Sequence, residues 1–529
     1  MFDVAIIGCG PVGAMAANLL GKAGLETLVI EKEANPFPLP RAVHLDHEMM
    51  RLFQAANVID KVKADMRDTE GHLHVGADHG VIRYMGTVGL DRPFGWSNDY
   101  FFYQPELEDH LRNALSKYEN VDLRLGTAFI SATQKENQVT LTLKNSNDEY
   151  QETARWVIAC DGASSSVRNS LGIQLDDLHF EEPWLVVDAD VDGPVQFPNL
   201  TGVPAEANLQ QLSVMMCDPS RPATIVPGRG NLRRWELMLL PGEDDNEMMK
   251  PEVVAELLKP WLEGVPHKIV RASTYRFHGL IAEQWRDGNI FLAGDAAHQT
   301  PPFFGQGMCH GLRDVANLAW KMSMILQGTA PENILDTYQT ERDPHVRAVI
   351  SAAVEAGRYI CILDKEKAAQ RDNEIRSQSK AQSLASTAAE LIPAITNGIV
   401  ASHTTHAGER FIQPKMKLEN NHLENNREIL LDDVTKNSWR LFVKDTNIAS
   451  GAKKFIRDYL SDVDISVYNA SSLADQGAIL KWLEDSQLTG VLVRPDFYIF
   501  GTCRDSSTPL LKEFSEKLKN PNPEHKNVA

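Results

Sequence analysis

Three glycines close to the N-terminus have the spacing of a turn that binds phosphate. An apolar run over residues 2–7 precedes them, and a stretch of small residues that predicts a helix over 11–23 follows. The turn consists of Gly8, Gly10 and Gly13, with Pro11 and Val12 between the last two. Gly8 permits a tight bend, Gly10 lets a pyrophosphate approach the backbone, and Gly13 lets the helix pack closely on the strand. Because free N–H groups at a helix start attract anions, the pattern predicts a dinucleotide site.

An acidic residue completes this pattern. The next apolar run, residues 27–32, ends in Glu31 and Lys32. Glu31 lies close to the offset at which such sites place an acceptor for the adenosine ribose hydroxyls. Strand, glycine turn, helix and acid together predict a Rossmann-type element. They do not distinguish NAD from FAD, and no second GxGxxG in a strand–helix setting occurs.

Two further pairs of glycine and aspartate follow apolar runs. Asp161 and Gly162 come after one run, and Gly294 and Asp295 come after another. Behind the second pair, "PPFF" (301–304) leads to Gly305, Gln306, Gly307, Met308 and a long amphipathic stretch. A helix that begins near 305–308 offers N–H donors and the positive end of its dipole to an anionic ligand. The apolar residues 301–304 predict a lining that excludes water.

The secondary structure that must position these residues is predicted to change along the chain. Residues 1–180 read as α/β, with helical spacing over 45–63 and a helix over 100–115. Alternating segments from about 181 to 275 predict a mostly antiparallel sheet, and two long helices are expected at 307–327 and 333–365. Residues 363–387 read as an exposed helix or a connector, and 415–430 as a linker. The tail predicts the order βαβαββα, which suggests a thioredoxin-like layout.

The three motifs in this order resemble those of the flavoprotein aromatic hydroxylases, the class that includes 4-hydroxybenzoate and phenol hydroxylases. Their pattern GxGxxG, DGxxSxVR and GDAAH with a proline and GxG is present here as residues 8–13, "DGASSSVR" (161–168) and "GDAAH" (294–298). The segments "PRAVHLDHEMMRLF", "FIQPKMKLEN", "LDTYQTER" and "VLVRPDFYIFGT" are similar to the branch that contains 3-(3-hydroxyphenyl)propionate hydroxylase. This resemblance covers nearly the whole chain.

The resemblance implies an α/β fold in which a Rossmann-like FAD-binding domain carries an inserted, mainly antiparallel β-sheet substrate domain. The FAD-binding domain is expected at 1–180 and 273–405, with 73–99 contributing to the substrate domain. The substrate domain is expected at 181–272. A C-terminal thioredoxin-like domain without CxxC is expected at 406–529.

The resemblance also implies which residues bind FAD. Arg41 and Gln104 match positions that touch the flavin or its ribityl-phosphate chain, and Asp295 matches an acid that bonds a ribitol hydroxyl. The full expected set is Gly8, Gly10, Pro11, Val12, Gly13, Glu31, Lys32, Arg41, Gln104, Asp161, Gly162, Gly294, Asp295, Pro301, Gly305, Gln306, Gly307, Met308 and Cys309. Cys309 stands where many relatives have Asn, and we interpret it as a packed thiol. His298 is expected to fix its loop by a hydrogen bond.

The implied reaction is an FAD-dependent monooxygenation. NADH or NADPH reduces the flavin, O₂ gives a C4a-hydroperoxide, and a phenolic ring attacks its distal oxygen. A 3-hydroxyphenylpropionate-like substrate from aromatic catabolism is expected, hydroxylated ortho or para to its OH. The candidate catalytic residues are Pro301, His44 and Tyr103, although His44 and Tyr103 are equally consistent with the core. The alternatives are another FAD oxidoreductase, such as a reductase or oxidase, or a non-catalytic FAD-bound interaction protein.

Bulk composition excludes several other functions. The net charge of −19 argues against nucleic acid or an anionic membrane as a partner. No basic leader and no long uncharged apolar run occur, and the six cysteines form no CxxC, so a cytoplasmic monomer or homodimer is expected. His44 and His47 lie three apart, but no third ligand is apparent, so no metal is expected.

Overall fold

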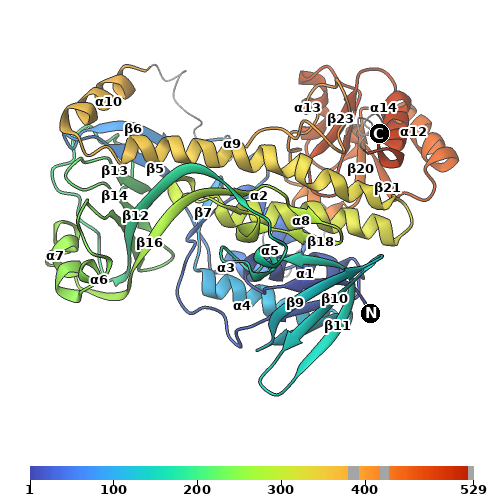
Figure 1. Cartoon of the computed structure of the whole chain (residues 1–529). Helices are drawn as coiled ribbons and strands as arrows, with labels where there is room; N and C mark the ends of the chain where they lie inside the picture. Colours follow the sequence, from blue (N-terminus) through green and yellow to red (C-terminus); the bar gives the residue numbers. More distant parts are fainter. Residues whose placement is uncertain (379–391, 418–427, 436, 522–529) are drawn as a thin grey trace.

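The computed structural model describes residues 1–378, 392–417, 428–435 and 437–521. Figure 1 shows two sheet-containing bodies and a C-terminal α/β unit. The long helix α9 (Thr337–Ile360) runs from the second sheet to the C-terminal unit. The expected long helix over 333–365 is therefore a short 3-10 turn, η4 (Glu332–Asp336), followed by α9.

The first sheet has the strand order β17-β18-β11-β1-β2-β8. Its parallel members are β1 (Phe2–Ile7), β2 (Thr27–Glu31), β8 (Val121–Leu125), β11 (Glu149–Ala159) and β18 (Ile290–Leu292). Antiparallel strands β9 (Ala128–Lys135), β10 (Gln138–Lys144) and β17 (Arg286–Asp287) extend it. β1 and β2 are continuous apolar runs because this parallel sheet is covered on its faces.

Helix α1 (Pro11–Lys22) follows β1 and is buried along most of its length. It contacts α8 (Gly307–Leu326) and α4 (Gln104–Ala114). Small residues also let α1 pack closely on the glycine turn and on β8, since a Cβ on Gly13 would overlap Gly8 and one on Gly21 would overlap Val121. The helix over 307–327 agrees with α8 to one residue.

The second sheet has the order β19-β16-β12-β15-β14-β13-β5-β6 and is antiparallel except where β13 pairs with β5. Its strands are β5 (Gly71–Val75), β6 (Val81–Gly86), β12 (Leu175–Val191), β13 (Ser213–Met216), β14 (Ala223–Pro227), β15 (Leu232–Met238), β16 (His267–Ala282) and β19 (His298–Gln299). Helices α6 (Asp245–Met248) and α7 (Pro251–Leu262) pack beside it, and they share a separate apolar core with the sheet.

A small third sheet connects the two bodies, with the order β3-β7-β4. It consists of β3 (His44–Asp46), β7 (Asp99–Phe101) and β4 (Arg67–Asp68). The helical pattern expected over 45–63 is interrupted: β3 leads into α2 (His47–Ala55), and α3 (Ile59–Ala64) follows. Asp46 caps α2 by accepting from the Glu48 N–H at 2.9 Å, and Asn57 at φ 57° ends it.

The C-terminal unit has a four-stranded sheet, β21-β20-β22-β23. It comprises β20 (Trp439–Val443), α12 (Thr446–Tyr459), β21 (Ile465–Asn469), α13 (Ala478–Asp485), β22 (Gly490–Val493), β23 (Ile499–Cys503) and α14 (Ser507–Lys519). Its element order agrees with the expected βαβαββα. Only β20 and β21 pair in parallel.

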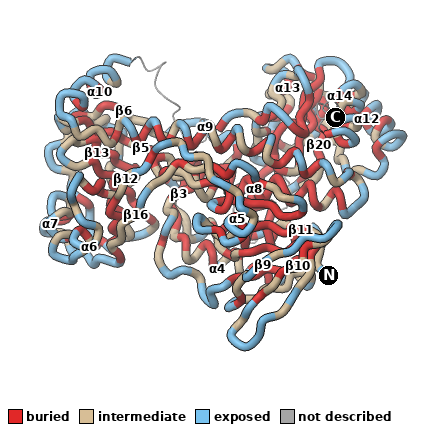
Figure 2. Tube along the Cα trace, viewed as in Figure 1, coloured by how far each residue is buried: buried red, intermediate tan, exposed pale blue. Residues whose placement is uncertain are grey.

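Short helices complete the described chain: α5 (Ser166–Ser170), α10 (Lys365–Ser377) and α11 (Leu431–Val434). The segment expected as a helix or connector is therefore helical at 365–377, and its remainder at 379–391 lies outside the described residues. Most of the expected linker, 418–427, and the last residues also lie outside them. Figure 2 shows buried backbone along α8, β11 and β20. Among the described residues, no helix has the length and apolar character needed to cross a bilayer.

Candidate functional site

The three sequence motifs meet at one edge of the first sheet. β1 pairs in parallel with β11, and β11 pairs in parallel with β18, so the carboxyl ends of these strands face the same way. Gly8 follows β1, Asp161 comes two residues after β11, and Gly294 comes two residues after β18. In sheets of this kind, ligands bind at the carboxyl ends of the strands.

The glycine turn is shaped by close backbone contacts. Gly8 has φ +97°, and a Cβ there would lie 2.4 Å from the Cys160 carbonyl oxygen. A Cβ on Gly13 would lie 1.9 Å from the Gly8 oxygen, whereas one on Gly10 would meet nothing within 4 Å. Helix α1 begins without a side-chain cap, so its first N–H groups are free for phosphate.

Glu31 lies at the end of β2, as the ribose-binding hypothesis requires. Its carboxylate accepts from the Cys9 N–H at 2.7 Å and the Glu33 N–H at 2.9 Å. Arg112 approaches it at 3.8 Å, and the neighbouring Lys32 is exposed. Glu31 therefore fastens the glycine turn to β2, and its contact with a ribose stays a prediction.

The second motif is tied directly to the third. One oxygen of Asp161, Oδ2, accepts from the Val167 N–H and the Ser166 hydroxyl, both at 3.1 Å. Arg168 donates to the carbonyls of Ala163 and Ala296, both at 2.9 Å. The position of this arginine in "DGASSSVR" therefore has a structural reason, because Arg168 holds the loop after β11 against the loop after β18.

The loop after β18 is held by a buried aspartate of α8. Asp314 Oδ2 accepts from the Gly294 N–H at 3.1 Å and lies 2.7 Å from His298 Nε2, while Arg342 donates to Oδ1 at 2.9 Å. Asp295 is exposed at the turn itself. His298 is fully buried, so the prediction that it fixes this loop by a hydrogen bond is confirmed.

Pro301 to Gly305 form the connection between this loop and α8. Residues Pro302–Phe304 make a 3-10 turn, and Gly305 at φ 61° closes it. The Phe303 ring contacts Trp184 and Phe277 of the second sheet at 5.9 and 6.4 Å between ring centroids. The loop therefore lies where the two sheets meet, and α8 begins after it without a side-chain cap.

Cys309, in the first turn of α8, is fully buried with its Sγ 3.8 Å from the Gly305 oxygen. Burial raises the pKa of this thiol, with only partial relief from Arg313, so the thiol stays protonated. The interpretation of Cys309 as a packed thiol is confirmed.

Three buried polar atoms along this edge have no partner: Asp161 Oδ1, Thr300 Oγ1 and Gln306 Nε2. Buried polar groups normally have a hydrogen-bond partner, so three unpaired ones at the same edge indicate a polar ligand. The open face at Gly10 and the uncapped start of α1 suit a pyrophosphate, and the uncapped start of α8 suits the electron-rich end of a flavin ring. The residues present therefore fit FAD.

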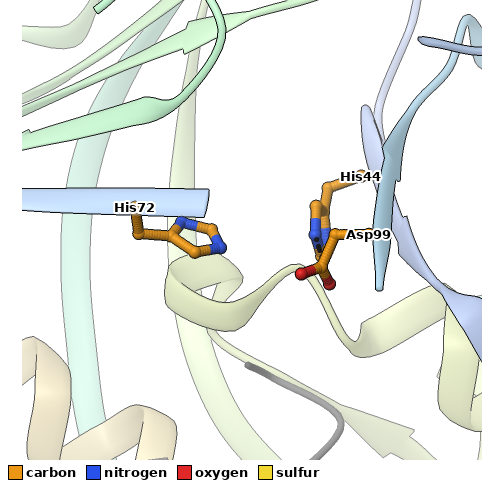
Figure 3. Close-up of side chains that lie close together, drawn as sticks. All are labelled: His44, His72 and Asp99. Carbon is orange, nitrogen blue, oxygen red and sulfur yellow. Dashed lines mark hydrogen bonds and ion pairs between the residues drawn. The ribbon is translucent and has the colours of Figure 1, made fainter. Parts of the chain in front are cut away.

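A second cluster, which we call the histidine cluster, consists of His44, Asp99 and His72 (Figure 3). His44 on β3 and Asp99 on β7 form a pair with Nε2 and Oδ1 3.1 Å apart. Burial by itself lowers the pKa of His44, but the hydrogen bond and charge of Asp99 outweigh it and the pKa is raised. A Cβ on Gly305 would lie 2.5 Å from His44 Nδ1, so the pair lies directly against the loop before α8.

Two other sequence candidates, Gln104 and Tyr103, contact the loop that precedes β3. The Gln104 side chain accepts from the N–H groups of Arg41 and Ala42 at 3.1 and 2.7 Å and thereby holds the loop before β3. The Tyr103 hydroxyl donates to the Pro38 carbonyl at 3.2 Å. Tyr103 lines a small cavity to which none of the histidine cluster belongs, so the structure does not bring it together with that cluster. The other lining residues are Pro40, Val43, Phe102, Asp188, Gly228, Arg229, Leu232, Arg233 and Arg234.

His47, the other half of the expected pair, also points elsewhere. Its ring packs on Phe94 with centroids 4.3 Å apart, and burial lowers its pKa to about 4. The neighbours of His44 are His72 and Asp99, which sequence reasoning missed. Two histidines alternating in "GHLHVG" were the available signal for one face of a strand, whereas nothing marked Asp99.

Helix α2 is held by a group of buried charged residues, which we call the charge network. It consists of Asp46, Glu48 and Arg313, together with the Arg51–Asp432 pair. Arg313 of α8 donates to Asp46 at 2.6 Å and to Glu48 at 2.9 Å. The Tyr498 hydroxyl of the C-terminal unit donates to Glu48 at 3.0 Å. Arg51 pairs with Asp432 at 2.8 Å. We call the edge of the first sheet at which the three motifs meet the cofactor edge. It is therefore connected through α2 to the C-terminal unit.

The fold and the site together define a flavoprotein whose cofactor edge faces the second sheet. Residues 1–353 match the family model described as FAD binding domain. The chain is 32% identical over 518 residues to a probable NADH-specific resorcinol 4-hydroxylase of Rhodococcus jostii, covering 96% of this chain and 92% of that protein. It is 34% identical over 423 residues to a 3-(3-hydroxyphenyl)propionate/3-hydroxycinnamic acid hydroxylase of Burkholderia cenocepacia, covering 78% and 75%.

Solved structures agree at the level of the fold. Aklavinone-11 hydroxylase in complex with FAD and aklavinone superposes with a TM-score of 0.77 at 23% identity, covering 98% of this chain and 99% of that one. The chain belongs to the FAD-dependent aromatic hydroxylases, which are flavoprotein monooxygenases. The family resemblance read from the three motifs is thereby confirmed.

Proposed function

We propose that this protein hydroxylates the ring of a phenol ortho or para to its hydroxyl group, with NADH or NADPH and O₂ as co-substrates. The observation that carries the proposal is the buried His44–Asp99 pair lying against Gly305. FAD, when bound, supplies the reducing equivalents and the activated oxygen. The work left to the protein is to orient the phenol and take up its proton.

The pair suits removal of that proton. Asp99 accepts from His44 Nε2 at 3.1 Å, which leaves Nδ1 as the basic nitrogen. Nδ1 is buried and makes no hydrogen bond of standard geometry, and the Gly305 backbone beside it adds to the effect of Asp99 in raising the pKa of His44. The raised pKa makes His44 a better proton acceptor than an ordinary imidazole. Loss of the phenolic proton to Nδ1 pushes electron density onto the ortho and para carbons, which are the positions that must attack oxygen.

The loop before α8 supports the same reaction. We assign Pro301 to the reacting edge of the ring, with the backbone of 305–309 and its uncapped helix start at the electron-rich end. The Phe303 ring and its aromatic neighbours close the site from the second sheet and keep water away from the reacting atoms.

The substrate class follows from the relatives. One acts on resorcinol by name and others on 3-(3-hydroxyphenyl)propionate, so a phenol with a meta substituent, as met in aromatic catabolism, is the proposed substrate. The NADH-specific relative supports a nicotinamide co-substrate.

We also propose that the described part of residues 406–529 adopts a thioredoxin-like arrangement without redox activity. The parallel β20–β21 pair followed by the antiparallel β22 and β23 supports the arrangement. The absence of CxxC from the sequence supports the lack of redox activity.

A panel of phenols tests the function. FAD-loaded protein is mixed with NADH or NADPH and each phenol, and nicotinamide oxidation is followed together with product identification. We expect at least one meta-substituted phenol to accelerate nicotinamide oxidation and to yield a diol or triol. Acceleration without an oxygenated product would indicate a reductase or oxidase, and no acceleration by any phenol would reject the proposal.

A further inference from the structure

His72 belongs to a different sheet from the His44–Asp99 pair, yet it faces that pair (Figure 3). It lies on β5 of the second sheet, and its ring meets the His44 ring edge-on with centroids 5.8 Å apart. One ligand atom from each of the three side chains lies within 4.8 Å of the others. The histidine cluster therefore joins the two sheets at the loop before α8.

Each member of the cluster also has a buried polar atom without a partner. These atoms are His44 Nδ1, His72 Nδ1 and Asp99 Oδ2. His74, two residues further along β5, accepts from the Tyr359 hydroxyl at 2.6 Å, so a buried histidine on this strand can find a protein partner. Unpaired polar atoms gathered from three strands point to a ligand that completes them.

We propose that His72 and the His44–Asp99 pair hold one phenolic oxygen between them, with His72 donating its N–H to that oxygen while His44 Nδ1 takes the proton. This inference rests on the proposed function and adds His72 as a substrate-binding residue. In the step, the phenol O–H bond breaks, the proton bonds to His44 Nδ1, and the electron pair stays on the oxygen as a phenolate. No oxidant or further reactant is needed.

The spacing fits a single oxygen atom. Hydrogen bonds of about 2.8 Å from each side to one oxygen span up to about 5.6 Å, and bent arrangements span less. One ligand atom of each side chain lies within 4.8 Å of those of the other two, a separation at which one oxygen can touch groups on both sides. A whole aromatic ring does not fit between groups this close, so the ring must extend away from the cluster with only its hydroxyl group inside.

The pKa values of His72 and His44 are shifted in opposite directions, and this gives the two histidines different roles. Burial, together with the charge of His44, lowers the pKa of His72 to about 4, so His72 stays neutral and keeps one N–H. The pKa of His44 is raised by Asp99 against the effect of burial. Two like groups whose environments push their pKa values apart serve as a donor and a proton acceptor. Asp46, whose charge also acts on His44, is already paired with Arg313.

The test uses FAD-loaded enzyme and the phenol that most stimulates nicotinamide oxidation, titrated by the change it causes in the flavin absorption spectrum. The methyl ether of the same phenol is titrated in parallel. The variants are His72→Phe, which removes the donor, and His72→Gln, which keeps one. His110→Gln is the control, because His110 forms a histidine–aspartate pair with Asp65 at 2.6 Å outside the cluster.

We expect His72→Phe to weaken binding of the phenol about tenfold while binding of the ether stays unchanged. His72→Gln should recover most of the loss, and the control should bind both ligands like the parent protein. The inference is overturned if His72→Phe binds the phenol normally, or if it weakens phenol and ether equally, which would show a role in shape alone.

A divalent cation is the competing occupant of the cluster. Zn²⁺ that competes with the phenol at stoichiometric concentration, and no longer does so in His72→Phe, would assign the cluster to a metal and overturn the inference. If no phenol stimulates the parent protein, the proposed function itself has failed and the inference fails with it. If phenols do stimulate it, a negative result with His72 rejects only the inference.

Discussion

The histidine cluster and the charge network share β3, which contributes His44 to the first and Asp46 to the second, and they treat buried polar groups in opposite ways. In the charge network, Arg313 reaches two carboxylates and Glu48 receives bonds from two directions. In the histidine cluster, one hydrogen bond joins His44 to Asp99, and each of the three members keeps a buried polar atom without a partner. Polar groups that complete one another stabilise the fold, and polar groups left incomplete are available to a ligand.

The pKa shifts agree with this difference. In the charge network, burial alone would raise the pKa values of Asp46 and Glu48, yet the charge of Arg313 lowers both, and that of Asp46 falls well below its usual range. The pKa of Arg313 is raised in turn. All three groups therefore remain charged at every ordinary pH, whereas the histidine cluster holds groups that exchange protons. The comparison predicts that mutations in the charge network act first on stability and mutations in the cluster act first on chemistry.

The largest expected effect is on the charge network. Arg313→Leu leaves buried Asp46 without its paired cation and leaves Glu48 with the more distant Arg410 at 3.5 Å, which costs about 3–5 kcal/mol of unfolding free energy. Denaturant unfolding of the FAD-free protein measures this loss. The matched control is Arg276→Leu, whose pair with Asp245 is about half exposed and is expected to contribute about 0–1 kcal/mol. Equal losses in the two variants would show that burial of the charge network does not matter.

The next effect separates chemistry from stability in the histidine cluster. His44→Gln removes the proton acceptor and is expected to lower the rate of product formation at least about 100-fold. The unfolding free energy should change much less than in Arg313→Leu. A variant that loses stability in step with its activity would place His44 among the structural residues.

The pH profile sharpens the same point. Because neutral His44 is the acceptor, the rate of product formation should fall as the pH drops through the raised pKa of this residue. Asp99→Asn removes the group that raises that pKa, so burial then dominates and the acidic limb should move to lower pH. The maximal rate should also fall, since the ring loses its orienting partner. An acidic limb that stays in place, or moves to higher pH, would contradict the role of Asp99.

The sequence predicts the cofactor edge well and the histidine cluster poorly, for a physical reason. The glycine turn, Glu31 and the helix α8 are set by neighbours along the chain, so their periodicity and spacing are visible in the sequence. The cluster forms only where β5 and β6 join a sheet whose remaining strands come from residues 175–299, and no local pattern records the pairing of β5 with β13.

The partners of buried charged residues are equally hard to predict from the sequence. Glu48 and Arg51 look like the polar face of a surface helix, but all nine residues of α2 are buried. Their partners come from far along the chain: Arg51 and Asp432 are 381 positions apart. The family resemblance supplied the flavin and the reaction class, while these long-range contacts required the folded chain.

The smallest expected effect tests whether the C-terminal unit supports the cofactor edge. Tyr498→Phe removes one hydrogen bond to charged Glu48 and leaves Arg313 in place, so the loss should be about 1–2 kcal/mol in unfolding free energy. Because Glu48 helps to hold Arg313 at the start of α8, FAD affinity should fall slightly as well. Tyr468→Phe is the control, since the Tyr468 ring stacks on Phe442 within the C-terminal unit. In a double-mutant cycle with Glu48→Gln, the effects of Tyr498→Phe on stability and FAD affinity should largely disappear. Additive effects would show that the C-terminal unit acts on the FAD edge by some route other than Glu48.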